Sequence, residues 1–319
     1  MSAVPNPPLR LGTRRSPLAM AQAEEARARL CAAHGWPLAA VEIVPVTASG
    51  DKVQDRPLAE IGGKALWTKE LDQWLMAGEI DFSVHSAKDV ETWRPVQVTI
   101  AAVLEREDVR DVLVLRHAQD ERGGARGLAD LPPGARIGTS APRRAAQVLH
   151  LRPDCQVVTF RGNVATRLGK LAAGEADATL LALAGLNRLG QPDVGQPLAV
   201  ESWLPAPGQG AIAIECRADD AATAEALSAI DHAPSRHALM AERDLLAALG
   251  GNCHSAIGVH TRHLGDALVL RAAIYALDGR EKVEREATFA LSDSEGPARL
   301  AADLLAGASP ALAACFDPP

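Results

Sequence analysis

The sequence predicts an α/β protein with two similar lobes and a small α+β domain near the C-terminal end. Its 319 residues suit two or three domains of about 100 residues each. Two short motifs also occur twice, in the same order, which indicates a repeated βα architecture.

The first repeated motif is a strand end followed by Gly-Thr, hydroxyl residues and a proline that opens a helix. It occurs at Leu11–Ala19 and again at Ile137–Arg144. Proline is favoured at the first helical position, and a preceding hydroxyl can cap the helix. The expected capping residues are Ser16 in the first copy and Thr139 or Ser140 in the second.

The second repeated motif is a helix end with glycine, followed by an apolar strand. Leu75–Asp81 precedes the first such strand, and Leu171–Asp177 precedes the second. Glycine commonly ends helices, and short apolar runs are typical of buried strands. The shared order predicts two similar α/β lobes, as in periplasmic binding proteins.

The helix starts of the first motif carry paired arginines, Arg14 and Arg15 in one copy and Arg143 and Arg144 in the other. A helix N-terminus attracts anions, and arginine binds carboxylates in a bidentate manner. Ligands of open α/β sheets bind at the carboxyl ends of the strands. The motif therefore predicts an anion-binding pocket, although for any one arginine taken alone a solvated surface is the better explanation.

Two chain crossings are expected between the lobes, at Val103–Asp111 and at Trp203–Ala211, with the apolar strand Ala211–Ile214 returning to the first lobe. A helix over Ala238–Leu249 and strands over 267–275 and 282–289 form the third domain. The expected divisions are 1–104 with 205–223 for lobe 1, 105–204 for lobe 2 and 224–319 for the C-terminal domain.

A dense polar cluster lies just beyond a predicted buried strand, within Asp81–Val90. Ser86, Lys88 and Asp89 fall where α/β proteins build their sites. A buried aspartate can stabilise a developing cation or move a proton. An ordinary turn in which Asp89 caps a helix explains the pattern equally well.

Cys253 follows a Gly-Gly-Asn sequence and precedes His254. An adjacent imidazole can lower the pKa of a thiol, which makes Cys253 a candidate reactive thiol, although a free buried cysteine is the commoner case.

Gly62–Leu71, which contains Trp67, lacks the features of a nucleotide-binding loop and is interpreted as a lid entering a helix.

Composition limits which binding partners and which cellular compartment we expect. The net charge of −7 argues against general nucleic-acid binding, and the arginines of residues 136–167 favour a small anion. No run of about 20 apolar residues and no secretory signal are evident, so we expect a cytoplasmic protein without membrane contact. The five cysteines contain no Cys-x-x-Cys pair, so neither a disulfide framework nor a metal site is expected.

From about Arg10 to Gly258 the chain closely resembles the porphobilinogen deaminase family. The resemblance rests on the order and spacing of nine segments: Arg10–Ala19, Pro57–Leu71, Asp81–Val90, Arg106–Asp111, Gly138–Arg144, Arg161–Arg167, Ala184–Gly190, Pro205–Arg217 and Ala241–Gly258. It implies a transferase of tetrapyrrole and heme biosynthesis that condenses four porphobilinogen molecules head to tail into hydroxymethylbilane and releases ammonia.

The resemblance also implies the roles of single residues. Cys253 holds a dipyrromethane cofactor through a thioether, and Asp89 is the catalytic residue that stabilises the positive charge of the pyrrole nitrogen and assists proton movement. The implied cofactor-binding residues are Ser86, Lys88, Thr139, Ser140, Arg143, Arg144, Arg161 and Arg167. The implied substrate-binding residues are Arg14, Ser16, Trp67, Arg188 and Gln209. We expect a monomer whose partner is a small acidic pyrrole.

The chain departs from the family pattern at several positions. The cofactor loop reads Asn252-Cys253-His254-Ser255-Ala256 instead of Gly-Cys-Gln-Val-Pro, and Glu91 replaces the proline that usually follows Lys-Asp-Val. Further departures occur at Glu60, Trp67, Ala141, Pro142 and Pro207. We expect activity to survive with altered loop, lid or hinge behaviour.

Two other functions fit part of the pattern. A two-lobed anion receptor without chemistry would share the repeat and the cationic helix starts, but the Lys88–Asp89 pair and Cys253 favour an enzyme. A thiol hydrolase would need a base and an orienting residue near Cys253.

Overall fold

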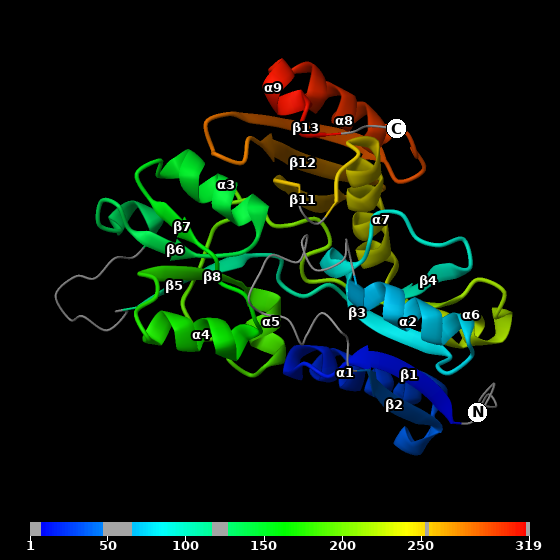
Figure 1. Ribbon diagram of the computed structural model, residues 1–319. Helices are drawn as coiled ribbons and strands as arrows, with labels where there is room; N and C mark the ends of the chain where they lie inside the picture. Colours follow the sequence, from blue (N-terminus) through cyan, green and yellow to red (C-terminus); the bar gives the residue numbers. More distant parts are fainter. Residues whose placement is uncertain (1–7, 47–65, 117–126, 253–254, 317–319) are drawn as a thin grey trace. The chain divides into compact units, whose positions relative to one another are not determined.

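The computed structural model describes residues 8–46, 66–116, 127–252 and 255–316 (Figure 1). The chain forms two compact units, one of Met1–Glu107 with Gly210–Leu239 and the other of Asp108–Gln209 with Met240–Pro319. The first unit, called lobe 1 below, holds a five-stranded sheet, and the second holds another five-stranded sheet and a three-stranded one. The predicted fold class is confirmed, whereas the limits of three separate domains stay a prediction.

Lobe 1 has the strand order β2-β1-β3-β10-β4. β1, β2 and β3 are parallel, and β10 is antiparallel to both of its neighbours. The predicted return of the chain after residue 210 is confirmed by β10. The elements of this lobe are β1 (Leu9–Arg14), α1 (Pro17–His34), β2 (Val41–Val46), α2 (Leu66–Met76), β3 (Phe82–Ser86), β4 (Val98–Val103), β10 (Ile212–Arg217) and α6 (Ala221–Ser228).

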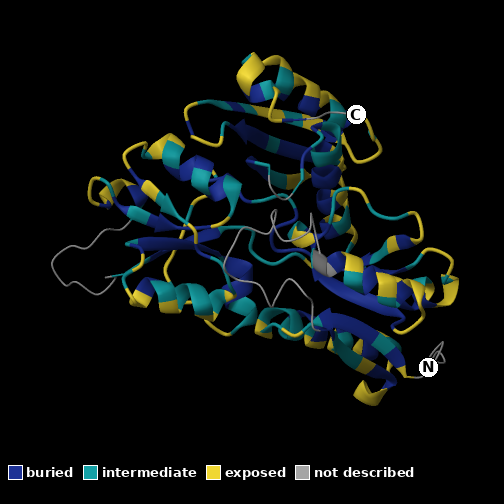
Figure 2. Ribbon diagram, in the orientation of Figure 1, coloured by how far each residue is buried: buried dark blue, intermediate teal, exposed yellow. Residues whose placement is uncertain are grey.

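The sheet of lobe 1 is buried on both faces (Figure 2). Apolar side chains of α1 and α6, such as Leu30 and Leu227, pack with Phe82 of β3. Leu71 and Leu75 of α2 form a second cluster with Val98. β3 alternates apolar and polar residues, yet Ser83 and His85 are buried as well as Phe82 and Val84, because both faces of the sheet are covered.

The five-stranded sheet of the second unit, called lobe 2, has the matching order β7-β6-β8-β5-β9. Its parallel strands are β7, β6 and β8, and β5 is the antiparallel strand. The elements are β5 (Asp111–Leu115), β6 (Arg136–Gly138), α3 (Pro142–Leu151), β7 (Gln156–Val158), α4 (Val164–Ala172), β8 (Ala178–Ala182), α5 (Leu183–Arg188) and β9 (Gln196–Pro197).

The sequence repeat corresponds to equivalent contacts in the two lobes. The Asp81 carboxylate accepts the backbone N–H of Arg10 at 2.7 Å, and that of Asp177 accepts the backbone N–H of Arg136 at 2.8 Å. Each of these arginines also forms an ion pair with its aspartate. The repeat therefore encodes one βα unit built twice, including the bond that joins its first and third strands.

The smaller domain of the second unit is a three-stranded antiparallel sheet with helices. Its elements are the part of α7 (Ala233–Ala248) from Met240 onward, β11 (Ile257–Leu264), β12 (Ala267–Tyr275), β13 (Lys282–Ala290), α8 (Gly296–Ala306) and α9 (Pro310–Ala313). The predicted helix and two strands are confirmed, but α7 begins before residue 238, and β11, α8 and α9 were not predicted. None of the helices in the described ranges is long and apolar enough to cross a membrane.

Candidate active site

The site residues predicted in lobe 1 come together at one edge of its sheet. Arg14 ends β1, and Ser16 follows it at the start of α1. Ser86 ends β3, and Lys88 and Asp89 follow directly in a short 3-10 helix, η4 (Ala87–Asp89). Because β1 and β3 are parallel neighbours, their carboxyl ends share an edge.

Local contacts hold these residues in place. The Ser16 hydroxyl accepts the N–H of Ala19 at 3.3 Å, which confirms Ser16 as the cap of α1. The Ser86 hydroxyl bonds to the buried Gln22 amide of α1, with Nε2 of Gln22 at 2.9 Å. Asp89 ends η4 and is exposed, so it caps no helix and is not the buried acid considered above. An exposed carboxylate beside Lys88 is open to a bound ligand.

The residues predicted in lobe 2 lie at the corresponding edge of that sheet. Thr139 and Ser140 follow β6, and Arg143 and Arg144 lie in the first turn of α3. Arg161 and Arg167 flank the start of α4, which follows β7, and Arg188 ends α5, which follows β8. β7, β6 and β8 are parallel neighbours, so these positions share one strand-end edge.

The capping prediction for α3 is wrong. Ala141 occupies the cap position and offers no side-chain bond, whereas the Thr139 hydroxyl accepts the N–H of Ala141 at 3.2 Å. Thr139 is buried and Ser140 is exposed. The proline at the first helical position moved the cap one residue beyond Ser140, and this leaves the Ser140 side chain at the surface.

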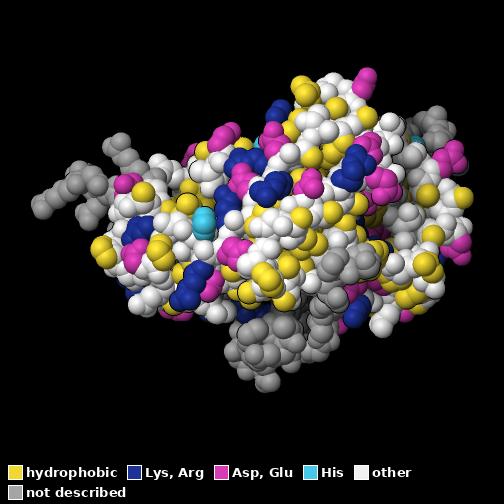
Figure 3. Space-filling view, turned by 90° about the horizontal axis from the view of Figure 1, so that it is seen from above, with side chains coloured by type: hydrophobic (Ala, Val, Ile, Leu, Met, Phe, Trp, Pro, Cys, Tyr) yellow, Lys and Arg dark blue, Asp and Glu magenta, His cyan; other side chains and the backbone are white. Residues whose placement is uncertain are grey.

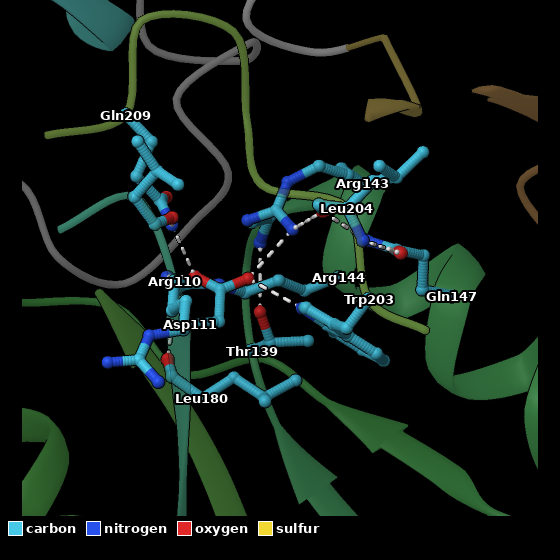
Figure 4. A network of polar contacts seen from close by, with 12 residues as sticks. Arg110, Asp111, Thr139, Arg143, Arg144, Gln147, Leu180, Trp203, Leu204 and Gln209 are labelled. Atoms are coloured by element: carbon cyan, nitrogen blue, oxygen red, sulfur yellow. Dashed lines mark hydrogen bonds and ion pairs between the residues drawn. The ribbon is translucent and has the colours of Figure 1, made fainter. Parts of the chain in front are cut away.

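Arg143 and Arg144 point into a buried network centred on Asp111, the first residue of β5 (Figure 4). Asp111 accepts from Nη1 of Arg143 and Nη2 of Arg144, each at 2.7 Å. It also accepts from the Trp203 indole at 2.7 Å and the Gln209 amide at 2.8 Å. The two guanidinium groups hold the pKa of the Asp111 carboxyl well below its usual range, despite its burial.

Further donors of this network bind the backbone. Arg144 donates to the Leu180 carbonyl at 2.9 Å, and Arg143 donates to the Leu204 carbonyl at 2.7 Å. Gln209, wholly buried, donates to the Val109 carbonyl at 2.7 Å, which joins the two chain crossings. Asp111 thus organises the arginines and both crossings, a role that its place in the sequence did not reveal.

Two arginines at the strand-end edge of lobe 2 retain buried donor atoms without a partner. Within the described part of the chain, Nε of Arg143 and Nη1 of Arg161 have no hydrogen-bond partner. Arg167, in contrast, donates from Nε to the Gly162 carbonyl at 3.0 Å. Buried cationic donors seldom remain unsatisfied, so these two atoms are the candidates at this edge for bonding an anionic acceptor.

Two predicted site residues cannot be located in the same detail. Cys253 lies outside the described residues. Trp67 belongs to α2, but its side chain also lies outside the described part. Among the described residues, no group of three or more His, Cys, Asp or Glu side chains could hold a metal ion.

The fold and the two strand-end edges define a two-lobed α/β protein with a cationic edge in lobe 2. Two family models match the chain: "Porphobilinogen deaminase, dipyromethane cofactor binding domain" over residues 9–225, and "Porphobilinogen deaminase, C-terminal domain" over residues 237–306. The chain belongs to the porphobilinogen deaminase family, and the predicted family, transferase class and dipyrromethane cofactor are confirmed.

Named relatives agree with this assignment. The chain is 56% identical over 315 residues to the porphobilinogen deaminase of Sphingopyxis alaskensis, with 98% of each chain covered. It is 50% identical over 285 residues to the porphobilinogen deaminase of Nitrobacter winogradskyi, covering 89% of this chain and 88% of the relative.

Solved structures similar to the chain include periplasmic domains. The BvgS VFT2 domain of Bordetella pertussis is 16% identical with a TM-score of 0.41, covering 74% of this chain and 91% of that one. A substrate-binding domain of a putative amino acid ABC transporter from Streptococcus pneumoniae is 12% identical with a TM-score of 0.41, covering 69% and 90%. These scores are low, and the relation between the lobes rests on their matching strand orders.

Proposed function

We propose that this chain joins four porphobilinogen molecules head to tail into hydroxymethylbilane and releases ammonia, with Asp89 as the catalytic residue and Cys253 as the covalent anchor of the primer. The observation that carries the proposal is the position of the Lys88–Asp89 pair at the strand-end edge of lobe 1, beside Arg14 and Ser16. Membership in the family supports the reaction class.

The residues of lobe 2 suit the acidic cofactor. The unpartnered donors of Arg143 and Arg161 and the exposed Ser140 hydroxyl fit carboxylate groups, and Thr139, Arg144, Arg167, Ser86 and Lys88 complete the proposed set. When bound through Cys253, the dipyrromethane supplies the pyrrole carbon to which the first substrate adds. Arg143 and Arg144 have a structural role beside this one, because Asp111 already pairs with both.

The carboxylate of Asp89 has a separate task. As ammonia leaves the aminomethyl group of the substrate, positive charge develops on the pyrrole nitrogen. An acceptor fixed beside that nitrogen stabilises the charge more in the transition state than in the ground state, which lowers the barrier. Arg14, Ser16, Trp67, Arg188 and Gln209 form the proposed substrate-binding set. Its cationic groups engage the acetate and propionate side chains, and Gln209, whose amide already donates to Val109 and Asp111, supports the set from the chain crossing.

The remaining parts of the proposal concern the whole molecule. We expect a cytoplasmic monomer of three domains that takes a small acidic pyrrole and binds neither nucleic acid nor membranes. The net charge of −7 argues against a nucleic-acid partner. On the face shown in Figure 3, the described Lys and Arg side chains alternate with Asp and Glu. Such a mixed surface disfavours the binding of a polyanion such as nucleic acid.

Substitution of Asp89 tests the proposal. Asp89→Asn should keep the helical circular dichroism signal and lose nearly all consumption of porphobilinogen. The matched control is Asp130→Asn, because Asp130 is also exposed and ends a three-residue 3-10 helix, in lobe 2. Retained turnover in Asp89→Asn would remove Asp89 from the mechanism.

A further inference from the structure

Lobe 1 contains a buried charge cluster that includes both ends of the segment carrying Lys88 and Asp89. Its centre is Arg94, which binds the Glu215 carboxylate of β10 in a bidentate manner, from Nε at 2.8 Å and Nη2 at 2.8 Å. Arg94 also donates from Nη1 to the Asp72 carboxylate of α2 at 3.1 Å. All three side chains are nearly inaccessible to solvent.

His85 of β3 contacts the same carboxylate. Its Nε2 lies 3.3 Å from Oε2 of Glu215 and 2.9 Å from the Ser83 hydroxyl. Burial, and secondarily the charge of Arg94, lowers the pKa of His85 to about 4, so the imidazole is neutral at neutral pH. Arg94 therefore supplies the positive charge that Glu215 requires.

These contacts fix both ends of the segment 85–94, called the Lys88–Asp89 loop below. His85 and Arg94 stand at the two ends of a ten-residue segment that contains Lys88 and Asp89, and both ends contact the single Glu215 carboxylate. A backbone hydrogen bond adds a further restraint near the start of the segment. The N–H of Ala87 donates to the carbonyl of Ala211, the residue before β10, at 3.0 Å. The segment is thus fixed at its start and its end while Asp89 itself stays exposed.

Glu91 strengthens the far end of the loop. Its carboxylate lies 3.7 Å from Nη1 of Arg94 and 4.0 Å from Nζ of Lys69 on α2. Glu91 is the residue that replaces the usual proline of the family pattern. A proline would restrict the backbone at this position, and in this chain the ion pairs of Glu91 and Arg94 supply the restraint instead.

We propose that Arg94, acting through Glu215, is a positioning residue that holds the Lys88–Asp89 loop in its reactive geometry. The inference rests on the proposed role of Asp89. A displacement of about 1 Å at a reacting group can lower a rate by about 100-fold. Lysine cannot reproduce the planar, bidentate contact of arginine, so Arg94→Lys should release the end of the loop without removing the charge.

Steady-state kinetics on the holoenzyme and hydrogen exchange of the loop test this inference. Arg94→Lys should lower kcat at least about 10-fold with a smaller change in KM. Peptides covering residues 86–93 should exchange faster, while those of α1 exchange as in the unaltered protein. The matched control is Arg217→Lys. Arg217 lies on β10, the strand that carries Glu215, and pairs with Asp220, away from the loop. It should leave both readouts unchanged.

The outcomes separate this inference from the proposed function. If Asp89→Asn retains turnover, the role of Asp89 fails first. If Asp89→Asn is inactive while a folded Arg94→Lys protein keeps its kcat and loop protection, only the positioning role is overturned. Should Arg94→Lys not fold, the charge-balanced pair Arg94→Gln with Glu215→Gln takes its place. If neither Arg94→Lys nor the double variant folds, Arg94 serves only the stability of the core, and the inference is overturned.

Discussion

Replacement of Asp111 by asparagine should destabilise lobe 2 more than any change at its surface. The carboxylate, which is completely buried, pairs with two arginines whose side chains are each 5% exposed. Removal of one partner from a buried ion pair costs about 3–5 kcal/mol, because the remaining charge stays buried without compensation. Asparagine preserves the volume, so the loss reports on charge and hydrogen bonding rather than on a cavity.

Hydrogen exchange is the suitable assay, since a protein of several units does not unfold in one step. At about 1.4 kcal/mol for each tenfold change, the peptides of β5 and α3 should exchange at least about 100-fold faster in Asp111→Asn. Peptides of β1 and α1 serve as an internal reference. Asp108→Asn is the matched control, because Asp108 pairs with the partly exposed Arg110 and such pairs contribute less than about 1 kcal/mol. Exchange within a few-fold of the unaltered protein would refute the pairing of Asp111 with both arginines.

Three further predictions follow from single contacts. Ser16→Ala removes the cap of α1 and should cost about 1 kcal/mol, measured as a lower melting temperature of lobe 1; an unchanged melt would remove the capping role. Gly138→Ala would place a Cβ 2.4 Å from the Phe160 ring and should cost about 1–3 kcal/mol, whereas Gly169→Ala on α4 meets no atom within 4 Å and should be neutral or stabilising. His85 has a folded pKa of about 4 and an unfolded pKa near 6.5, so the unfolded state binds the extra proton as the pH falls. From pH 7 to pH 5 this should remove about 2 kcal/mol from the stability of lobe 1, measured by hydrogen exchange of the β3 peptides relative to their intrinsic rates at each pH, and His85→Asn should abolish this part of the loss.

The repeat made much of the fold predictable. The paired motifs correspond to β1 with α1 and to β6 with α3, and the glycines that follow the next helices, Gly78 and Gly174, have φ of 68° and 78°. These features are local, so the sequence displays them directly. β11 was missed because its second half is exposed and polar, which weakens the apolar signal of a strand.

The site was predictable by position but not by contact. The strand-end location of Ser86, Lys88, Asp89, Thr139 and Ser140 follows from the order of elements, which periodicity indicates. The partners of Arg143 and Arg144 do not, because Asp111 lies 32 or more residues away along the chain and reaches them only through the pairing of β5 with β8. Arg94 gave no signal, since the two carboxylates nearest to it, Asp72 and Glu215, come from a helix and a distant strand.

The most direct test of the account is the intact mass of the purified protein. We expect a mass that exceeds that of the polypeptide by one dipyrromethane. The added mass should be absent from Cys253→Ala and kept in Cys315→Ala, which removes an exposed thiol. An unaltered protein that is active without the added mass, or a Cys253→Ala protein that retains it, would contradict a primer anchored at Cys253.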